Sequence, residues 1–432
     1  MRVSIFKLPW NRAKLLWSFL AGRERVPALP VEYIVETTAK CNLYCPMCPR
    51  ETHKQPKEDM SDQVFQALVE GSAGTAEHMM LIGLGEPLMD RKIFDRIGYC
   101  ERHGISSLLS TNGTLLDEEA AARLLDSPLA HITLSFDGAS KETFEHYRKG
   151  ARFERVRDNF VRFARMKHQR GSKMQVVAQM VRMPGNAHEV DEFRSFWSSV
   201  PGVDQVRVKE DETNLVQPES RRTPSEGVKT KMTRCHYLWR GAMYVKHDGR
   251  VFPCCQSYAL DGAPVGDLRT ETLSQIFNSD DMRRLRGLHA QGRGAEIDMC
   301  SRCSTPIPHP ALAAASLLVH GKWVRRALPL VERLIRGRRL PEGLLMPART
   351  DLVQIQQRHR AVAVVAEVQD SPQPGRDRLL SCSGSAAQVP EERHSAVGAL
   401  AKVKNSPQSG RDRLPSCSGS AAHVSGKSPD GI

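Results

Sequence analysis

The sequence predicts an α/β fold in which parallel strands alternate with helices that lie outside the sheet. Between residues 31 and 215, short alternating or β-branched segments take turns with longer segments in which apolar residues recur at helical spacing. Such alternation makes each helix the crossover between two strands that run in one direction. Cysteine and other polar residues also follow several strands directly, at the carboxyl edge where ligands bind in parallel sheets.

Strands are predicted from period-two alternation and β-branched content, at Val31–Glu36, His78–Leu84, Ser107–Thr111, His131–Phe136, Met174–Arg182 and Gln205–Lys209. Helices are predicted between them from apolar spacing, at Asp62–Glu70, Arg91–Arg102, Asp117–Leu125, Lys141–Arg148 continuing through Phe153–Lys167, and Glu189–Ser198.

Three cysteines follow the first strand, with three residues between Cys41 and Cys45 and two between Cys45 and Cys48. A short loop with this spacing can wrap three thiolates around three corners of a cubane iron–sulfur cluster, which leaves the fourth iron open to a small molecule. Zinc fits less well, because a structural zinc site takes four ligands. Disulfide bonds fit poorly too, because the cysteines number 11 and no signal peptide precedes them, which favours a reducing cytoplasm.

This motif resembles that of radical SAM enzymes. The resemblance implies that Cys41, Cys45 and Cys48 hold a [4Fe–4S] cluster, and that S-adenosylmethionine (SAM) binds the open iron through its amino and carboxylate groups. An electron from the cluster then cleaves SAM to a 5′-deoxyadenosyl radical. The resemblance also implies a more specific fold, a partial (β/α)6 barrel of TIM type. Met47 stands where the family usually has an aromatic residue, and a methionine can still pack beside a cofactor.

Two further segments resemble the cofactor-binding segments of the family. Gly83-Leu84-Gly85-Glu86-Pro87 is similar to its GGEP segment with Leu84 in place of a glycine, which implies that the backbone of Gly85 and Glu86 contacts the amino group of SAM. Ser135-Phe136-Asp137-Gly138 looks like its ribose-binding segment. Alternation along a strand puts Ser135 and Asp137 on one face, although such a pair can also cap a turn.

Two other residues are expected at the cofactor. Asn112 follows the third strand, at the same edge as Glu86 and Asp137, although Asn-Gly by itself indicates only a turn. Arg148 resembles an arginine that lies near the SAM carboxylate in relatives.

A second set of cysteines lies downstream. Cys235 is followed by 13 residues, Gly249, four more residues and Cys254, and a later pair is Cys300 and Cys303. A hairpin with Asp-Gly at its turn is predicted around Gly249, and it can carry Cys254 back beside Cys235. Four thiolates can hold a second cluster or a zinc ion, and the spacing does not decide between them.

The second set resembles the auxiliary-cluster extension of radical SAM enzymes, whose long form is called SPASM and whose short form is called twitch. The further cysteines of the long form are absent between the hairpin and the pair, so the resemblance implies the short form with one auxiliary [4Fe–4S] cluster. Cys254 is favoured over the adjacent Cys255 by its distance from Gly249. Val265–Leu268 and Ser274–Leu288 resemble the short strand and the helix of that module.

The 432 residues divide by composition into a basic amphipathic segment (1–30), the barrel (31–215), a small α+β auxiliary module (216–307), a second basic amphipathic segment (308–345) and a low-complexity tail (346–432). The tail carries two copies of one short segment and little apolar content, so it is predicted to be disordered. The linker at 217–230 is polar and basic, as a mobile connection or a lid is.

The net charge is +13, and the two amphipathic segments carry much of it. Each has tryptophan beside clustered Lys and Arg, as helices that lie on anionic lipid do; the alternative is ordinary packing on the barrel. Neither segment is long and apolar enough to span a membrane. No nucleic-acid-binding motif accompanies the charge, so a cytoplasmic location, with the membrane surface as an alternative, is predicted.

An auxiliary cluster implies either that an electron is taken from the substrate radical or that the substrate binds near a second metal centre. By resemblance the first hypothesis is a dehydrogenase for a sugar-type or other small molecule, with a flavodoxin or ferredoxin as electron donor. The alternatives are a peptide or protein maturase, weakened because no peptide-clasping domain precedes Val31, an enzyme for lipid-linked substrates, and a non-enzymatic iron–sulfur protein. Oxidation needs a base, and the acidic run Glu210, Asp211 and Glu212 after the sixth strand supplies candidates, unless it is a solvated turn.

Overall fold

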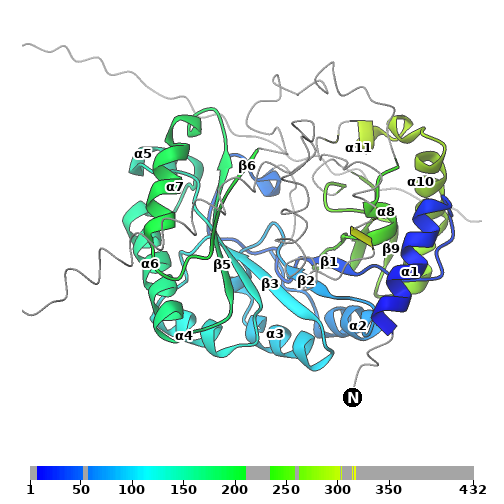
Figure 1. Ribbon diagram of the computed structural model, residues 1–432, viewed down its shortest axis with the longest axis horizontal. Coiled ribbons are helices and arrows are strands. Elements are labelled where there is room, and N and C mark those ends of the chain that lie inside the picture. Colours follow the sequence, from blue (N-terminus) through cyan, green and yellow to red (C-terminus); the bar gives the residue numbers. More distant parts are fainter. Residues whose placement is uncertain are drawn as a thin grey trace, which may run out of the picture. The chain divides into compact units, whose positions relative to one another are not determined.

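The computed structural model describes residues 7–51, 57–210, 234–257, 262–301, 303, 314 and 316–317 (Figure 1). The chain divides into two units, residues 1–369 and 370–432, and the second lies outside the described residues. So do the predicted linker at 217–230, most of the second basic segment and the predicted disordered tail.

The described strands form one sheet in the order β6-β5-β4-β3-β2-β1-β7-β8-β9. The six barrel strands are parallel and are β1 (Glu32–Val35), β2 (His78–Leu81), β3 (Ser106–Thr111), β4 (His131–Ser135), β5 (Gln175–Arg182) and β6 (Gln205–Glu210). They confirm the predicted partial (β/α)6 barrel, with strand ends that differ by only a few residues from the prediction.

Helices follow the strands as crossovers and lie on the outer side of the sheet (Figure 1). They are α2 (Asp62–Ser72), α3 (Ile93–Arg102), α4 (Glu118–Asp126), α5 (Lys141–Tyr147), α6 (Phe153–Gln169) and α7 (Val190–Ser199). The helix predicted to continue from Lys141 to Lys167 is in fact two helices. Gly150 between them has φ of +98°, a left-handed conformation that ends a helix.

The two faces of the barrel strands differ in their surroundings. In β1, Tyr33 and Val35 are fully buried towards the helices, whereas Ile34 between them is only partly buried. Because side chains alternate along a strand, Ile34 and its counterparts face the barrel interior. This alternation assigns each strand residue either to the core or to the interior where a ligand binds.

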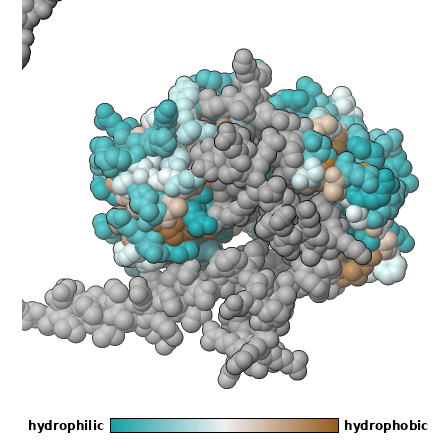
Figure 2. All heavy atoms as spheres, turned by 90° about the horizontal axis from the view of Figure 1, so that it is seen from above, coloured by the Kyte–Doolittle hydropathy of each residue, from teal (hydrophilic) through white to brown (hydrophobic). Residues whose placement is uncertain are grey.

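The N-terminal helix α1 (Lys7–Leu20) packs one face on the protein. Leu15 and Phe19 are buried in the main core, and buried Arg12 forms an ion pair with buried Glu77. On the other face Trp10 and Trp17 are 66% and 59% exposed. The described surface visible in Figure 2 is mostly hydrophilic, so two exposed tryptophans on one helix are unusual for it. None of the described helices is long and apolar enough to cross a membrane.

The auxiliary module extends the barrel sheet. After α8 (Tyr237–Arg240), strand β7 (Met243–Val245) pairs in parallel with β1, and β8 (Arg250–Phe252) and β9 (Gly266–Asp267) add antiparallel strands. The predicted hairpin between β7 and β8 is present, with Gly249 at φ of +92° in its turn.

Short helices complete the auxiliary module. They are α9 (Leu273–Phe277), α10 (Asp280–Ala290) and α11 (Asp298–Ser301). The single helix predicted at Ser274–Leu288 is interrupted, because Ser279 starts α10 as an N-cap that accepts a hydrogen bond from the backbone N–H of Met282.

Candidate functional site

The loop that carries Cys41, Cys45 and Cys48 follows the carboxyl end of β1. The three thiols are mostly enclosed, and burial raises the pKa of each, that of Cys48 to about 11. At Cys48 the nearby thiols of Cys45 and Cys41 raise the pKa further. Three thiols that disfavour one another's ionisation have the donor chemistry that a cationic iron centre compensates.

Hydrogen bonds fix this loop to its neighbours. The Asn112 side-chain amide donates to Asn42 Oδ1 at 3.1 Å and lies 3.9 Å from Cys41 Sγ. Asn42 in turn donates to the Thr114 hydroxyl at 2.8 Å. The predicted residue Asn112 therefore supports the cysteine loop from the end of β3.

Glu86 holds the end of β3 from the neighbouring loop. Its buried carboxylate accepts hydrogen bonds from the Thr111 hydroxyl and the Asn112 backbone N–H, both at 2.7 Å. Burial raises the pKa of Glu86, and these hydrogen bonds oppose the rise. The Glu86 backbone N–H donates a hydrogen bond to the Lys40 carbonyl. This bond connects the same loop to the cysteine motif.

Arg148 and Asp137 form a buried ion pair beside the thiols. Arg148 Nε donates to Asp137 Oδ2 at 2.7 Å, and the Val181 N–H donates to Asp137 Oδ1 at 2.7 Å. Burial would lower the pKa of Arg148, but the charges of Asp137 and of Cys45 raise it above its usual value. The Asp137 carboxylate is thus engaged within the protein. Among the described residues, the Ser135 hydroxyl forms a side-chain hydrogen bond only with the Ser110 hydroxyl, at 3.1 Å.

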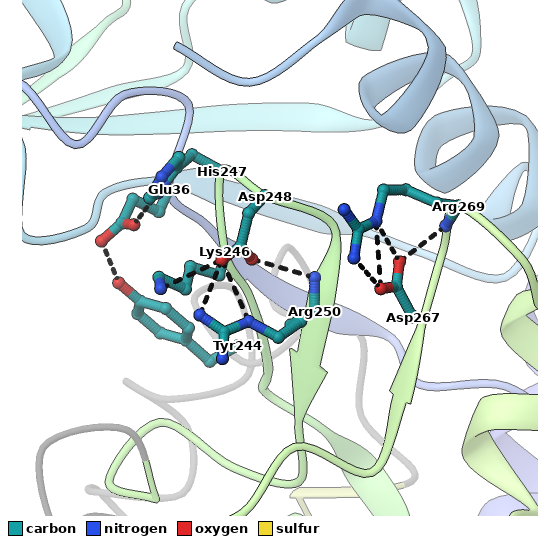
Figure 3. Close-up of polar contacts among 8 residues, drawn as sticks. All are labelled: Glu36, Tyr244, Lys246, His247, Asp248, Arg250, Asp267 and Arg269. Carbon is teal, nitrogen blue, oxygen red and sulfur yellow. Dashed lines mark hydrogen bonds and ion pairs between the residues drawn. The ribbon is translucent and has the colours of Figure 1, made fainter. Parts of the chain in front are cut away.

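A second buried carboxylate, Glu36, joins the cofactor loop to the auxiliary hairpin (Figure 3). It accepts hydrogen bonds from the Tyr244 hydroxyl at 2.6 Å, from His247 Nδ1 at 2.7 Å and from the Leu84 N–H at 3.0 Å. Glu36 is the residue after β1, Tyr244 and His247 come from β7 and its turn, and Leu84 lies in the predicted SAM-binding segment. We name these four residues the Glu36 network.

The two glycines of that segment are required by close packing. A β-carbon at Gly83 would lie 2.5 Å from Glu36 Cγ, and one at Gly85 would lie 2.0 Å from the Thr38 carbonyl oxygen, distances at which atoms clash. Leu84 between them is partly buried against Tyr244 and Phe252. This pocket, formed by the auxiliary hairpin, explains how a leucine takes the place of the usual glycine.

The second cysteine set also converges. Burial raises the pKa of Cys235, Cys254 and Cys300, that of Cys300 to about 12. After burial, the thiols of Cys254, Cys300 and Cys303 all raise the pKa of Cys235. The Cys255 thiol instead lies close enough to Tyr237 to affect its hydroxyl. Burial is the largest cause of the raised pKa of Tyr237, and the charge of Cys255 is the next.

The converging thiols are not arranged around one ion. Among the described residues, no three His, Cys, Asp or Glu side chains are placed to hold a single metal ion. Around one zinc each sulfur would lie about 2.3 Å from the metal, whereas in a cubane cluster each thiolate binds a different iron. The donor set fits the cluster better.

A histidine touches this second set. His289 Nδ1 accepts a hydrogen bond from the Cys235 N–H at 3.4 Å, so its Nε2 carries the proton and donates to Cys300 Sγ at 3.4 Å. Burial lowers the pKa of His289 to about 4, which keeps the ring neutral. A donor to a ligand sulfur tunes a metal centre from outside the ligand set.

Of the predicted bases, Glu210 ends β6, and Asp211 and Glu212 lie outside the described residues.

Sequence reasoning missed Glu36 and its partners. An acidic residue that ends a strand, just before the cysteine loop, was the available signal. Its two side-chain donors, Tyr244 and His247, lie 208 and 211 residues away along the chain.

Comparison with known proteins identifies two families along the chain. Residues 35–196 match the radical SAM superfamily, and residues 235–304 match the SPASM iron–sulfur cluster-binding domain. Together the matched ranges contain all seven predicted metal ligands.

Individual relatives are similar over short stretches. An AdoMet-dependent heme synthase of Oleidesulfovibrio alaskensis is 29% identical over 26% of this chain and 29% of its own length. The mycofactocin maturase MftC of Mycobacterium ulcerans is 28% identical over 29% of this chain and 34% of its own length. The matches thus span about a third of these relatives.

Among solved structures, Streptococcus suis SuiB bound to its precursor peptide SuiA gives a TM-score of 0.50 at 14% identity, covering 65% of this chain and 71% of that chain. At this identity the likeness concerns the fold.

The Glu36 network predicts that the auxiliary hairpin affects SAM binding. His247→Leu removes one donor to a buried carboxylate, so the Leu84 loop should loosen and the Kd for SAM should rise by about 5- to 30-fold, equivalent to 1–2 kcal/mol. His247→Asn, whose amide N–H can replace Nδ1–H, should restore much of the affinity. Equilibrium dialysis of the reconstituted protein measures this.

Arg269→Gln is the matched control, because Arg269 pairs with Asp267 on the same module away from Glu36 (Figure 3). Wild-type SAM affinity in His247→Leu, at equal iron content, would contradict the role of the network.

Proposed function

Because this chain belongs to the radical SAM superfamily and carries a SPASM-type iron–sulfur domain, we propose that it is a cytoplasmic oxidoreductase that dehydrogenates a substrate bound in the barrel. The observation that carries the proposal is the parallel pairing of β1 with β7, since one thiol set follows β1 and the other begins beside β7. A cofactor site and an electron-accepting site are thereby built on adjacent strands.

The two domains imply SAM and [4Fe–4S] clusters, including an auxiliary cluster. When bound, these groups supply the reductive cleavage of SAM, the hydrogen-atom abstraction and the electron acceptor that a dehydrogenation needs. Cys41, Cys45 and Cys48 would hold the first cluster. Cys235, Cys254, Cys300 and Cys303 would hold the second, and Cys255, whose thiol raises the pKa of Tyr237, would stay outside the ligand set.

The residues around the first cluster would position SAM. Gly85 offers its carbonyl, which accepts no hydrogen bond from the described residues, to the amino group. Ser135 offers its hydroxyl to the ribose. Three other side chains would act on SAM indirectly, by positioning the residues around it. Asn112 holds the cysteine loop, Glu86 holds the end of β3, and Asp137 holds Arg148.

Dehydrogenation also releases a proton, which requires a base near the substrate. Glu210, at the end of β6, remains the proposed base, together with Asp211 and Glu212. A flavodoxin or ferredoxin would supply the electron that reduces the first cluster.

A sugar-type or other small polar substrate is our first candidate. Ser110, Ser135 and Gln179 are partly buried on the interior side of β3, β4 and β5, and neutral hydrogen-bonding groups of this kind suit hydroxyl-bearing ligands. A peptide is the second candidate, supported by the similarity to a mycofactocin maturase and to a structure bound to a precursor peptide.

The central test is reductive cleavage of SAM. Under anaerobic dithionite the reconstituted protein should form 5′-deoxyadenosine without added substrate. The Cys41→Ala/Cys45→Ala/Cys48→Ala protein should form none, because its first cluster has no protein ligands. Chromatography of the products gives the readout.

Cys100→Ala is the control, since Cys100 is fully buried against Met79 on a helix away from both sets. Cleavage that persists in the triple variant, or no cleavage by the wild type, would leave only an iron–sulfur binding protein.

We further propose that α1 rests on an anionic membrane surface, where a lipid-linked substrate would be reached. Lys14 lies 5.9 Å from the centre of the Trp10 ring and Arg23 lies 5.9 Å from that of Trp17, so the exposed aromatic face is flanked by positive charge. This combination is typical of interfacial helices.

Trp10→Ser/Trp17→Ser should weaken binding to phosphatidylglycerol vesicles at least about tenfold, because each large apolar side chain contributes roughly 1.5–3 kcal/mol when buried. Sedimentation with vesicles measures the effect. Leu115→Ser/Phe196→Ser, which changes two exposed apolar residues elsewhere, should bind as the wild type does. Equal binding by all three proteins, or binding by none, excludes the proposed surface.

A further inference from the structure

Strand β6 presents an arginine to the barrel interior. Val206 and Val208 pack against the main core, so Arg207 between them points to the opposite side of the sheet. In the register of the sheet, Arg207 lies beside Gln179 of β5, which lies beside Ser135 of β4. Arg207 is therefore level with the hydroxyl that we assign to the SAM ribose.

This guanidinium has no partner among the described residues. None of the described residues forms a hydrogen bond or an ion pair with the Arg207 side chain, and among their influences burial alone acts on its pKa, which it lowers. A nearby carboxylate would raise that pKa, as Asp137 does for Arg148.

A fully buried arginine elsewhere in the fold has all its donor nitrogens occupied. Arg286 has no ion pair among the described residues, but its three nitrogens donate to the carbonyls of Leu238, Glu24 and Phe277 at 2.8–2.9 Å. Arg207 has no such acceptor in the part of the chain that the structure describes. The contrast separates a structural arginine from one whose donors remain available.

A partly buried cation without an acceptor is costly, because it loses water without gaining a hydrogen bond. A guanidinium has five N–H donors in a planar fork that matches a carboxylate or a phosphate. A ligand anion would thus stabilise Arg207 through paired, charge-assisted hydrogen bonds. The neighbouring Gln179 adds a neutral donor at the same level.

We propose that Arg207, with Gln179, binds an anionic group of the substrate, a carboxylate or a phosphate. This inference rests on the proposed function for the identity of the ligand as a substrate, and it restricts the substrate class to acidic or phosphorylated molecules. Bound in this way, the substrate is anchored on β6, at the opposite end of the barrel strand order from β1 and its cysteine loop.

SAM carries a carboxylate of its own, so the experiment must separate two sources of the anion. Arginines of the reconstituted wild-type protein are labelled with phenylglyoxal, and the rate at each arginine is followed by peptide mass mapping. The additions are none, inorganic phosphate, acetate, or SAM.

Phosphate or acetate should slow the labelling of Arg207 several-fold in a saturable manner and leave Arg194, a partly exposed arginine of the adjacent α7, unchanged. SAM alone should not slow it. Labelling of Arg207 that neither anion slows would overturn the anion site, and protection by SAM alone would reassign the arginine to the cofactor.

A variant pair gives a second readout. Inorganic phosphate should raise the Tm of the wild type and of Arg194→Gln, but not that of Arg207→Gln. An equal rise in all three proteins contradicts the proposal. Neither readout needs turnover, so the anion site is tested even if the protein forms no 5′-deoxyadenosine, the outcome that counts against the proposed function.

Discussion

The arrangement of both thiol sets depends on the parallel pairing of β1 with β7, in which Tyr33, Ile34 and Val35 lie beside Met243, Tyr244 and Val245. A partial barrel leaves the backbone groups of β1 unpaired on one side. The auxiliary module satisfies them by adding its own strand, and this places its hairpin beside the loop that follows β1. The two parts of the chain thus share one sheet.

The buried charged side chains of the barrel differ in how completely they are hydrogen-bonded or paired. Two carboxylates are buried, Glu36 directly after β1 and Glu86 in the loop after β2, and each accepts three hydrogen bonds. Buried carboxylates satisfied in this way fix the loops that donate to them. Asp137 neutralises Arg148 next to the thiols, whereas none of the described carboxylates pairs with Arg207. The charged groups around the cysteine loop are therefore hydrogen-bonded or paired within the protein, whereas the charge on β6 is the one that we propose a ligand anion neutralises.

Local pattern predicted much of this fold, and non-local contacts account for what it missed. Alternation located the strands because each has one face on the core, and the cysteine spacing located the thiols. The break at Gly150 was missed because apolar spacing continues across it. The joining of β7 to β1, and the contact of His247 with Glu36, could not be read from a local period, because their partners lie far apart in sequence. The alternation of Val206, Arg207 and Val208 can be read from the sequence of the strand. That none of the described residues accepts a hydrogen bond from the Arg207 side chain can be seen only in the folded structure.

Two separate cluster sites, held by two separate thiol sets, are the central feature of the proposed enzyme. The most direct test is the iron and acid-labile sulfide content, per chain, of the anaerobically reconstituted wild type and of the protein with Ala at Cys41, Cys45 and Cys48. One cubane cluster holds about four irons, so the wild type should contain about eight and the variant about four. A variant that retains no iron, or that holds zinc instead, would show that the second set is not an iron–sulfur site and would contradict the oxidative function.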